Sequence, residues 1–204
     1  MGINSDLPEG LYHPSFEKDA CGIGFVANLK GKKSHEVIKD ALVMLENMEH
    51  RGGCGCEKNT GDGAGILIQI PHLFYKEEAR KLNIDLPDFG KYGTGLTFFP
   101  KNEAHKARCR ELLYEVATKL NMTILGWRKM SVDNSLVGPI ALSGEPDIEQ
   151  IFIIPNYHLQ DSDELERKLF VFRNYVTHII HKEVENSIDL FYFTSLSAST
   201  VIYK

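Results

Sequence analysis

Apolar residues recur along the chain with two periods, one typical of helices and one typical of strands. Spacings of three and four residues predict helices behind Ser34, over residues 72–82 and 102–120, and behind Asp161. Short apolar or alternating runs predict strands over residues 21–29, 66–70, 94–99, 123–130, 149–155, 190–195 and 199–203. The last two strands are separated by a short turn, so they are expected to form a hairpin. The alternation of helices and strands predicts a mixed α/β fold.

Residues at the expected helix ends support these boundaries. Ser34 is a candidate N-cap, because its side-chain oxygen can accept a hydrogen bond from the first helical turn. Paired glycines after Arg51 predict the end of the same helix. Asp161 followed by Glu164 is similar to a capping box and predicts the start of the last long helix. The first helix is expected to bury an apolar stripe made of Val37, Ala41, Leu45 and Met48.

Composition narrows the classes of protein that fit this pattern. The chain has 204 residues, of which 43% are hydrophobic, so it can form the core of one domain or part of a larger one. Its formal net charge of -5 argues against a nucleic-acid partner, and no apolar run is long enough to span a bilayer. Residues 1–20 are polar and lack the features of a secretory signal or a transit peptide. We therefore expect a cytoplasmic protein, in which disulfides are rare.

In a reducing compartment, each cysteine has to be explained as a core residue, a metal ligand or a catalyst. Cys21 opens a predicted strand, and glycines at positions 22 and 24 are expected to leave room around its sulfur. A thiol has a pKa of about 8.5 and needs a base to become the reactive thiolate. If the bond before Cys21 were cut, the new α-amine, with a pKa of about 7.7–8.0, could act as that base. The alternative is a small buried residue at the start of a strand.

The glycine-rich stretch from Thr60 to Gly65 is similar to a phosphate-binding loop only in composition. A dinucleotide-binding fingerprint lies between a strand and a helix, whereas here a strand follows directly. We expect the glycines to provide tight backbone geometry and Asp62 to hydrogen-bond that backbone. Cys54 and Cys56 lack the second pair of ligands that structural zinc requires, so no metal site is predicted.

The order of these motifs resembles that of one enzyme family. Residues 44–66 read MLENMEHRGGCGCEKNTGDGAGI, and ACGIGFVANL precedes them at residues 20–29. Together these segments resemble the start of the large chain of glutamate synthase, which is a class II glutamine amidotransferase domain. The resemblance runs from about Tyr12 to the end of the chain and is densest between Asp19 and Pro71.

This resemblance implies a fold and a reaction. The fold would be that of an N-terminal nucleophile hydrolase, a four-layer αββα sandwich with antiparallel sheets, incomplete at the C-terminus of this chain. Residues 1–20 would be a leader, and residues 21–204 would be the first half of the amidotransferase domain. Cys21, as the first residue of the mature enzyme, would attack the side-chain amide of glutamine with help from its own α-amine. Ammonia would leave, and water would release glutamate from the thioester.

The resemblance also implies cofactors and partners outside this chain. In the parent enzyme the ammonia aminates 2-oxoglutarate at a second site, which uses FMN and an iron–sulfur cluster. No cofactor is expected within residues 1–204. The implied partners are glutamine as substrate, the remaining synthase domains of the same polypeptide, and an electron-donating subunit or ferredoxin.

Several residues match the family's motif around the nucleophile. Arg51 matches the arginine of a His-Arg-Gly turn, which implies a supporting role beside Cys21 together with Gly22 and Gly52. His50 of the same turn is expected to be structural, because a histidine at a helix end usually satisfies a local carbonyl group. The loop near the site is expected to contain Thr60, Gly61, Asp62 and Gly63.

The family's other site residues have no matching motif before Lys204. They are an Asn-Gly pair that forms the oxyanion hole, an arginine that binds the α-carboxylate of glutamine and an aspartate that binds its amine. We therefore expect little or no glutaminase activity from residues 1–204 alone. The alternatives are another class II amidotransferase and a non-catalytic interaction module.

Overall fold

The structure, a computed structural model, describes residues 22–53, 55, 57, 60–159, 161–185 and 187–204. The helices are α1 (His35–Asn47), the 3-10 helix η2 (Glu49–Arg51), α2 (His72–Lys81), α3 (Glu103–Lys119), α4 (Pro139–Ser143), α5 (Ser162–Glu183) and α6 (Ser187–Leu190). The strands are β1 (Ile66–Gln69), β2 (Gly93–Phe99), β3 (Met122–Lys129), β4 (Asp147–Pro155), β5 (Tyr192–Phe193) and β6 (Thr200–Tyr203). No helix in these ranges combines the length and the apolar character needed to cross a membrane.

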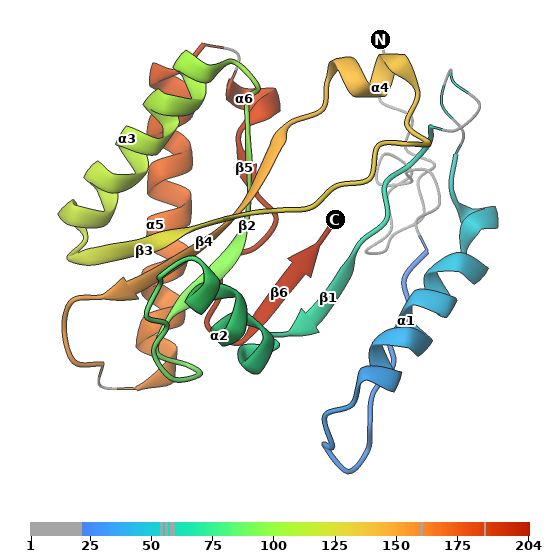
Figure 1. The fold of residues 1–204 in the computed structure, drawn as a ribbon, viewed down its shortest axis with the longest axis horizontal. Coiled ribbons are helices and arrows are strands. Elements are labelled where there is room, and N and C mark those ends of the chain that lie inside the picture. The colour runs from blue at the N-terminus through green and yellow to red at the C-terminus, as the bar shows by residue number, and fades with distance from the viewer. Residues whose placement is uncertain (1–21, 54, 56, 58–59, 160, 186) are drawn as a thin grey trace, which may run out of the picture.

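Two antiparallel sheets organise the strands (Figure 1). The larger sheet has the order β3-β4-β2-β5, and the smaller one pairs β1 with β6. Helices α3 and α5 lie side by side and cover one face of the larger sheet, while α2 and the smaller sheet lie against its other face. The chain is therefore mixed α/β, as the alternation of helices and strands predicted, and its sheets are antiparallel, as the resemblance implied.

Strand β4 is buried on both faces, and this explains its continuous apolar sequence. Ile151 and Ile153 pack into a core formed with α3 and α5, whereas Phe152 packs into a second core with α2 and β6. Successive side chains of a strand point to opposite faces, so the part of the strand that lies between the two cores, residues 151–154, is apolar at every position. The strand therefore joins the two cores into one folded unit.

The predicted elements between residues 66 and 155 are confirmed within two residues at each end. The caps are also as expected. Ser34 accepts a hydrogen bond from the backbone N–H of Glu36 at 3.0 Å, and Asp161 accepts one from Glu164 at 2.6 Å. The short helices α4 and α6 were not predicted, because neither is long enough to show a helical period.

The predicted hairpin at the end of the chain is wrong. Strand β5 pairs with β2 in the larger sheet, through Thr97 with Phe193, whereas β6 pairs with β1 in the smaller sheet. Between them the chain leaves one sheet and joins the other. A short separation between two strands favours a hairpin only when no stronger pairing exists for each strand elsewhere.

Contacts to the connection between β5 and β6 explain this change of sheet. The carboxylate of Glu166 on α5 accepts hydrogen bonds from the hydroxyl of Ser197 at 2.8 Å, the N–H of Ala198 at 2.9 Å and the hydroxyl of Ser199 at 2.6 Å. Thr94 and Ser197 also exchange two backbone hydrogen bonds, of 2.9 and 3.2 Å. These bonds stabilise the connection in a path that differs from that of a hairpin turn.

A strand was predicted over residues 21–29, of which the structure describes residues 22–29, and no strand is observed there. Residues 22–28 have no regular secondary structure and make no ladder with another strand among the described residues. Ile23 and Phe25 are 93% and 90% exposed, because no described element covers that side of the segment. The alternation in the sequence therefore did not lead to a paired strand.

The apolar stripe of α1 is also less buried than expected. Val37, Ala41, Leu45 and Met48 are half-buried, and no residue of α1 is fully buried. The helix lies at one side of the molecule, beside residues 22–28 and β1 (Figure 1). Among the described residues, residues 22–28 and β1 are therefore the main segments beside its apolar face.

The role of Glu166 in this change of sheet can be tested by substitution. Glu166→Ala removes the acceptor of three hydrogen bonds, so we expect it to lower the free energy of unfolding by about 2 kcal/mol. Urea denaturation measures this change. As a matched control, Glu185→Ala removes an exposed carboxylate and should change stability by less than about 0.5 kcal/mol. Equal stability of the two variants would show that Glu166 does not stabilise the connection between β5 and β6.

Candidate active site

The turn after α1 forms one side of the candidate site. Backbone hydrogen bonds from Arg51 to Met48 at 2.8 Å and from Gly52 to Glu49 at 3.0 Å close the 3-10 turn. His50 Nδ1 lies 3.0 Å from the carbonyl oxygen of Asn47. This contact supports the structural interpretation of His50, because the ring satisfies a carbonyl group at the helix end.

Residues 22–24 pass directly over this turn and over α1. A Cβ atom on Gly22 would lie 2.9 Å from Sδ of Met48 and 3.5 Å from Cβ of Arg51, and one on Gly24 would overlap the side chain of Met44. Methionine side chains therefore occupy the space beside both glycines. Glycine allows the backbone to lie against the helix. Cys21 itself lies outside the described residues.

The side chain of Arg51 is exposed. Among the described residues, its guanidinium has no hydrogen-bond acceptor and no ion-pair partner. Because Gly22 follows Cys21 directly, Arg51 lies beside the backbone next to the predicted nucleophile. A guanidinium in this place can stabilise a thiolate or a developing negative charge.

A short arm connects this turn to β1. Asp62 accepts a hydrogen bond from the N–H of Gly53 at 2.9 Å and donates its own N–H to the carbonyl oxygen of Gly53 at 3.0 Å. The N–H of Gly55 donates to the carbonyl oxygen of Thr60 at 2.6 Å. We call residues 53–62 the arm; its described residues are 53, 55, 57 and 60–62. The expectation that Asp62 hydrogen-bonds the backbone is confirmed.

The expected loop residues therefore lie near the turn. The arm carries Thr60, Gly61 and Asp62 back to Gly53, which follows Gly52 in sequence. Gly63 lies farther along, where its Cβ position would be 3.9 Å from Cε of Lys204. Gly22, Arg51, Gly52 and Asp62 are thus brought together, whereas Gly63 lies toward β6.

Glu57 is a residue of the arm that the sequence analysis did not single out. Its carboxylate accepts hydrogen bonds from the hydroxyl of Thr60 at 3.0 Å, from the N–H of Ile140 at 2.9 Å and from the N–H of Ala141 at 3.3 Å. The bond from Ile140 is the main cause that lowers the pKa of Glu57 below its ordinary value of 4.5. Near pH 7 this carboxylate is therefore ionised. No local signal predicts this contact, because its partners are more than 80 residues away.

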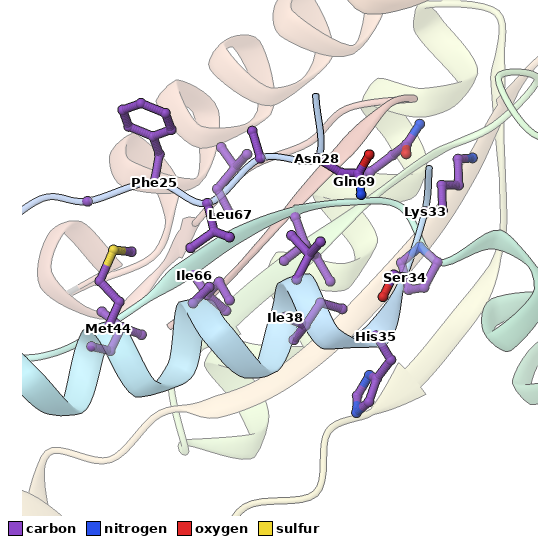
Figure 2. A pocket seen from close by; sticks show the side chains of 18 of the residues that line it. Phe25, Asn28, Lys33, Ser34, His35, Ile38, Met44, Ile66, Leu67 and Gln69 are labelled. Carbon is purple, nitrogen blue, oxygen red and sulfur yellow. The ribbon is translucent and has the colours of Figure 1, made fainter. Parts of the chain in front are cut away.

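An apolar cavity begins beside the candidate site. It has a volume of about 930 Å³ and lies between residues 22–28, α1 and β1. Figure 2 shows Met44 projecting from α1 toward residues 22–28, while Phe25 points away from the helix. The lining is dominated by aliphatic side chains, and its ionisable residues, Lys32, Lys33 and His35, lie at and just before the start of α1.

The described cysteine and metal-ligating residues do not form a second site. Cys109 on α3 is fully buried, and burial raises the pKa of its thiol to about 11. It is therefore a core residue in the thiol form. Within the described ranges, no group of three or more histidine, cysteine, aspartate or glutamate side chains could hold a metal ion. Cys54 and Cys56 lie outside the described residues.

Comparison with known proteins agrees with these motifs. Residues 21–204 match the family of glutamine amidotransferases of class II. The glutamate synthase (NADPH) large chain of Bacillus subtilis is 40% identical over 201 residues, covering 96% of this chain and 12% of that protein. The glutamate synthase (NADH) of Saccharomyces cerevisiae is 42% identical over 203 residues, covering 96% of this chain and 9% of that protein.

A third relative differs in its electron donor. The ferredoxin-dependent glutamate synthase 2 of Synechocystis is 37% identical over 188 residues, covering 92% of this chain and 12% of that protein. The chain thus spans 9% to 12% of the length of these three relatives. The family match covers most of the chain and begins at Cys21. The chain therefore belongs to the class II glutamine amidotransferases.

Proposed function

We propose that this chain is the glutaminase part of a glutamate synthase. The observation that carries the proposal is the placement of Gly22, the neighbour of Cys21, against the turn that holds Arg51. The arm returns Asp62 to the same turn through two hydrogen bonds with Gly53. Identities of 37% to 42% with glutamate synthases support the assignment.

In the proposed reaction, Cys21 is the nucleophile. Removal of residues 1–20 gives Cys21 a free α-amine, which takes the proton of the thiol. The thiolate attacks the side-chain amide carbon of glutamine, and the amine returns the proton to the departing ammonia. Water, deprotonated by the same amine, then attacks the thioester and releases glutamate and the free thiol.

Arg51 has a supporting electrostatic role in this proposal. A nearby cation lowers the pKa of a thiol, and Arg51 has no counterion among the described residues. Gly52 and Gly22 allow the turn and the nucleophile segment to approach each other. Thr60, Gly61, Asp62 and Gly63 form the loop beside the site, in which Asp62 sets the backbone position of Gly53.

We propose that residues 21–204 are the first half of a four-layer αββα sandwich. Two observations support this. The exposed segment 22–28 has no strand partner among the described residues, and β1 pairs with β6 along one edge only. The apolar cavity between them has the kind of lining that an additional strand would cover. Residues beyond Lys204 would then supply the oxyanion hole and the groups that bind the α-carboxylate and α-amine of glutamine.

The rest of the proposed enzyme would use the ammonia to aminate 2-oxoglutarate, with FMN and an iron–sulfur cluster in other domains. Relatives named for NADPH, NADH and ferredoxin share similar identity with this chain. The electron donor is therefore a property of parts outside this domain, either an electron-donating subunit or ferredoxin. We propose a cytoplasmic location for this enzyme, in keeping with the polar composition of residues 1–20.

The first prediction concerns processing. In the full-length polypeptide, we expect the intact mass to show loss of residues 1–20, with Cys21 at the new N-terminus. Cys21→Ala should lose at least about a thousandfold in glutamine hydrolysis, whether or not the leader is removed, because the substitution removes the nucleophile. An active preparation with the full uncleaved mass would contradict the role of the α-amine.

The second prediction concerns the isolated chain. Purified residues 1–204 should hydrolyse glutamine at least about 10²–10³-fold more slowly than the full-length enzyme, since even one oxyanion-hole donor contributes that much to the rate. Ammonia release measures the difference. Comparable rates would mean that residues 1–204 contain a complete site.

The third prediction distinguishes an enzyme from a non-catalytic interaction module. A glutamine analogue that carries an electrophile should modify Cys21 in the mature full-length protein and spare Cys109, whose thiol is buried. Peptide mass spectrometry identifies the labelled residue. Equal modification of every cysteine, or of none, would favour the module. Another class II amidotransferase would label in the same way but would not aminate 2-oxoglutarate.

A further inference from the structure

The contact between Glu57 and α4 joins two parts of the chain that are distant in sequence. Glu57 Oε1 accepts from the N–H of Ile140 at 2.9 Å, and Oε2 accepts from the N–H of Ala141 at 3.3 Å. Oε2 also accepts from the hydroxyl of Thr60 at 3.0 Å, within the arm. Both oxygens of one carboxylate are therefore used, and two of the three donors are backbone groups whose positions are fixed by a helix.

Helix α4 is itself fixed to the larger sheet. It lies in the connection between β3 and β4, on the same side of the molecule as the chain that leads into β1 (Figure 1). Glu145, two residues after α4, accepts hydrogen bonds from Lys101 at 2.7 Å and from Asn134 at 2.6 Å. Lys101 is two residues beyond the end of β2. A chain of polar contacts therefore runs from the larger sheet through α4 to the arm.

The glycine before α4 provides the space for this carboxylate. A Cβ atom on Gly138 would lie well within 3.0 Å of both carboxylate oxygens of Glu57. The φ angle of Gly138 is -70°, which any residue can adopt. Glycine is therefore required for close approach and not for backbone conformation.

At its other end, the arm reaches the candidate active site. The paired hydrogen bonds between Gly53 and Asp62 join it to the turn that contains Arg51. We propose that Glu57 is a positioning residue of the glutaminase, which anchors the arm to α4 and so holds the arm beside Arg51 in the arrangement that binds glutamine. This inference rests on the proposed function. Glu57 itself would not contact glutamine in this role.

A loosened arm should affect binding more than chemistry. If the binding-competent position of the arm is only fractionally populated, the apparent affinity for glutamine falls by that fraction. Once glutamine is bound, the arm is in place and the chemical step proceeds as in the parent enzyme. The expected signature is therefore a raised KM for glutamine with a nearly unchanged kcat.

The test compares two substitutions that break the contact from opposite sides in the full-length enzyme. Glu57→Gln removes the charge and turns one acceptor into a donor, and Gly138→Ala displaces the carboxylate while leaving it intact. We expect each to raise the KM for glutamine hydrolysis about five- to tenfold with kcat within about twofold. The double variant should be no worse than the more affected single variant, because both act on one contact. Glu111→Gln, which removes an exposed charge on α3, is the matched control and should change neither constant.

Hydrogen exchange provides a readout that does not depend on activity. In Gly138→Ala, the amides of Ile140 and Ala141 should exchange at least about tenfold faster, because the displaced carboxylate no longer accepts from them. In Glu57→Gln, which keeps one acceptor oxygen, at least one of these two amides should exchange faster to the same extent. Unchanged KM values with faster exchange would overturn the inference, and so would additive effects in the double variant or a fall in kcat alone. A parent enzyme that fails to hydrolyse glutamine, or one that survives Cys21→Ala, would instead overturn the proposed function.

Discussion

The path of the chain between β5 and β6 is the constraint on which the rest of the arrangement depends. Thr94 and Ser197 exchange two backbone hydrogen bonds there, and Glu166 accepts from three consecutive residues of the connection. Because the chain changes sheets at this point, β6 becomes the partner of β1. A Cβ atom on Gly65, just before β1, would lie 3.0 Å from the carbonyl oxygen of Tyr203, so this position leaves little room for a side chain. The start of β1, and with it the end of the arm, is positioned by a contact made far from the candidate site.

Elements with strong local signals were predictable from the sequence. The helix behind Ser34 begins at the expected cap, and α5 begins behind Asp161, because capping depends on side chains within three residues of the helix start. Strand β4 was predictable for a different reason. Residues 151–154, which lie between the two cores, form a short apolar run that is typical of a buried strand.

Features that depend on distant partners were not predictable. Two strands separated by a short turn suggested a hairpin, but their partners lie far away in sequence, with Gln69 of β1 paired to Thr200 and Thr97 of β2 paired to Phe193. In the same way, Glu57 gave no signal, because its acceptor role depends on α4, a five-residue helix that has no period of its own. Residues 22–28 show the reverse case. Their alternation is typical of a strand, yet pairing also requires a neighbouring edge within hydrogen-bonding distance.

The candidate site shows the same division. The helix end at the paired glycines and a backbone hydrogen bond of Asp62 could be predicted from local backbone chemistry, whereas Arg51 was selected through the resemblance to glutamate synthases. The resemblance to glutamate synthases selected Cys21, which periodicity alone would have left as a core residue. The contact between Glu57 and α4 could not be predicted from the sequence, because a carboxylate in a loop is most often solvated.

Exposure of Arg51 limits what this half of the site can do alone. Two unit charges 4 Å apart interact by about 1 kcal/mol in bulk water but by about 4 kcal/mol at the lower effective dielectric near a protein surface. Arg51 and the segment beside Cys21 are both exposed, so the guanidinium would stabilise a thiolate only weakly in this arrangement. Covering the adjacent cavity of about 930 Å³ would exclude water from the same region and strengthen that interaction without moving Arg51. In the proposed enzyme, completion of the sandwich would therefore supply two things at once, namely the missing substrate-binding groups and the low dielectric that makes Arg51 effective.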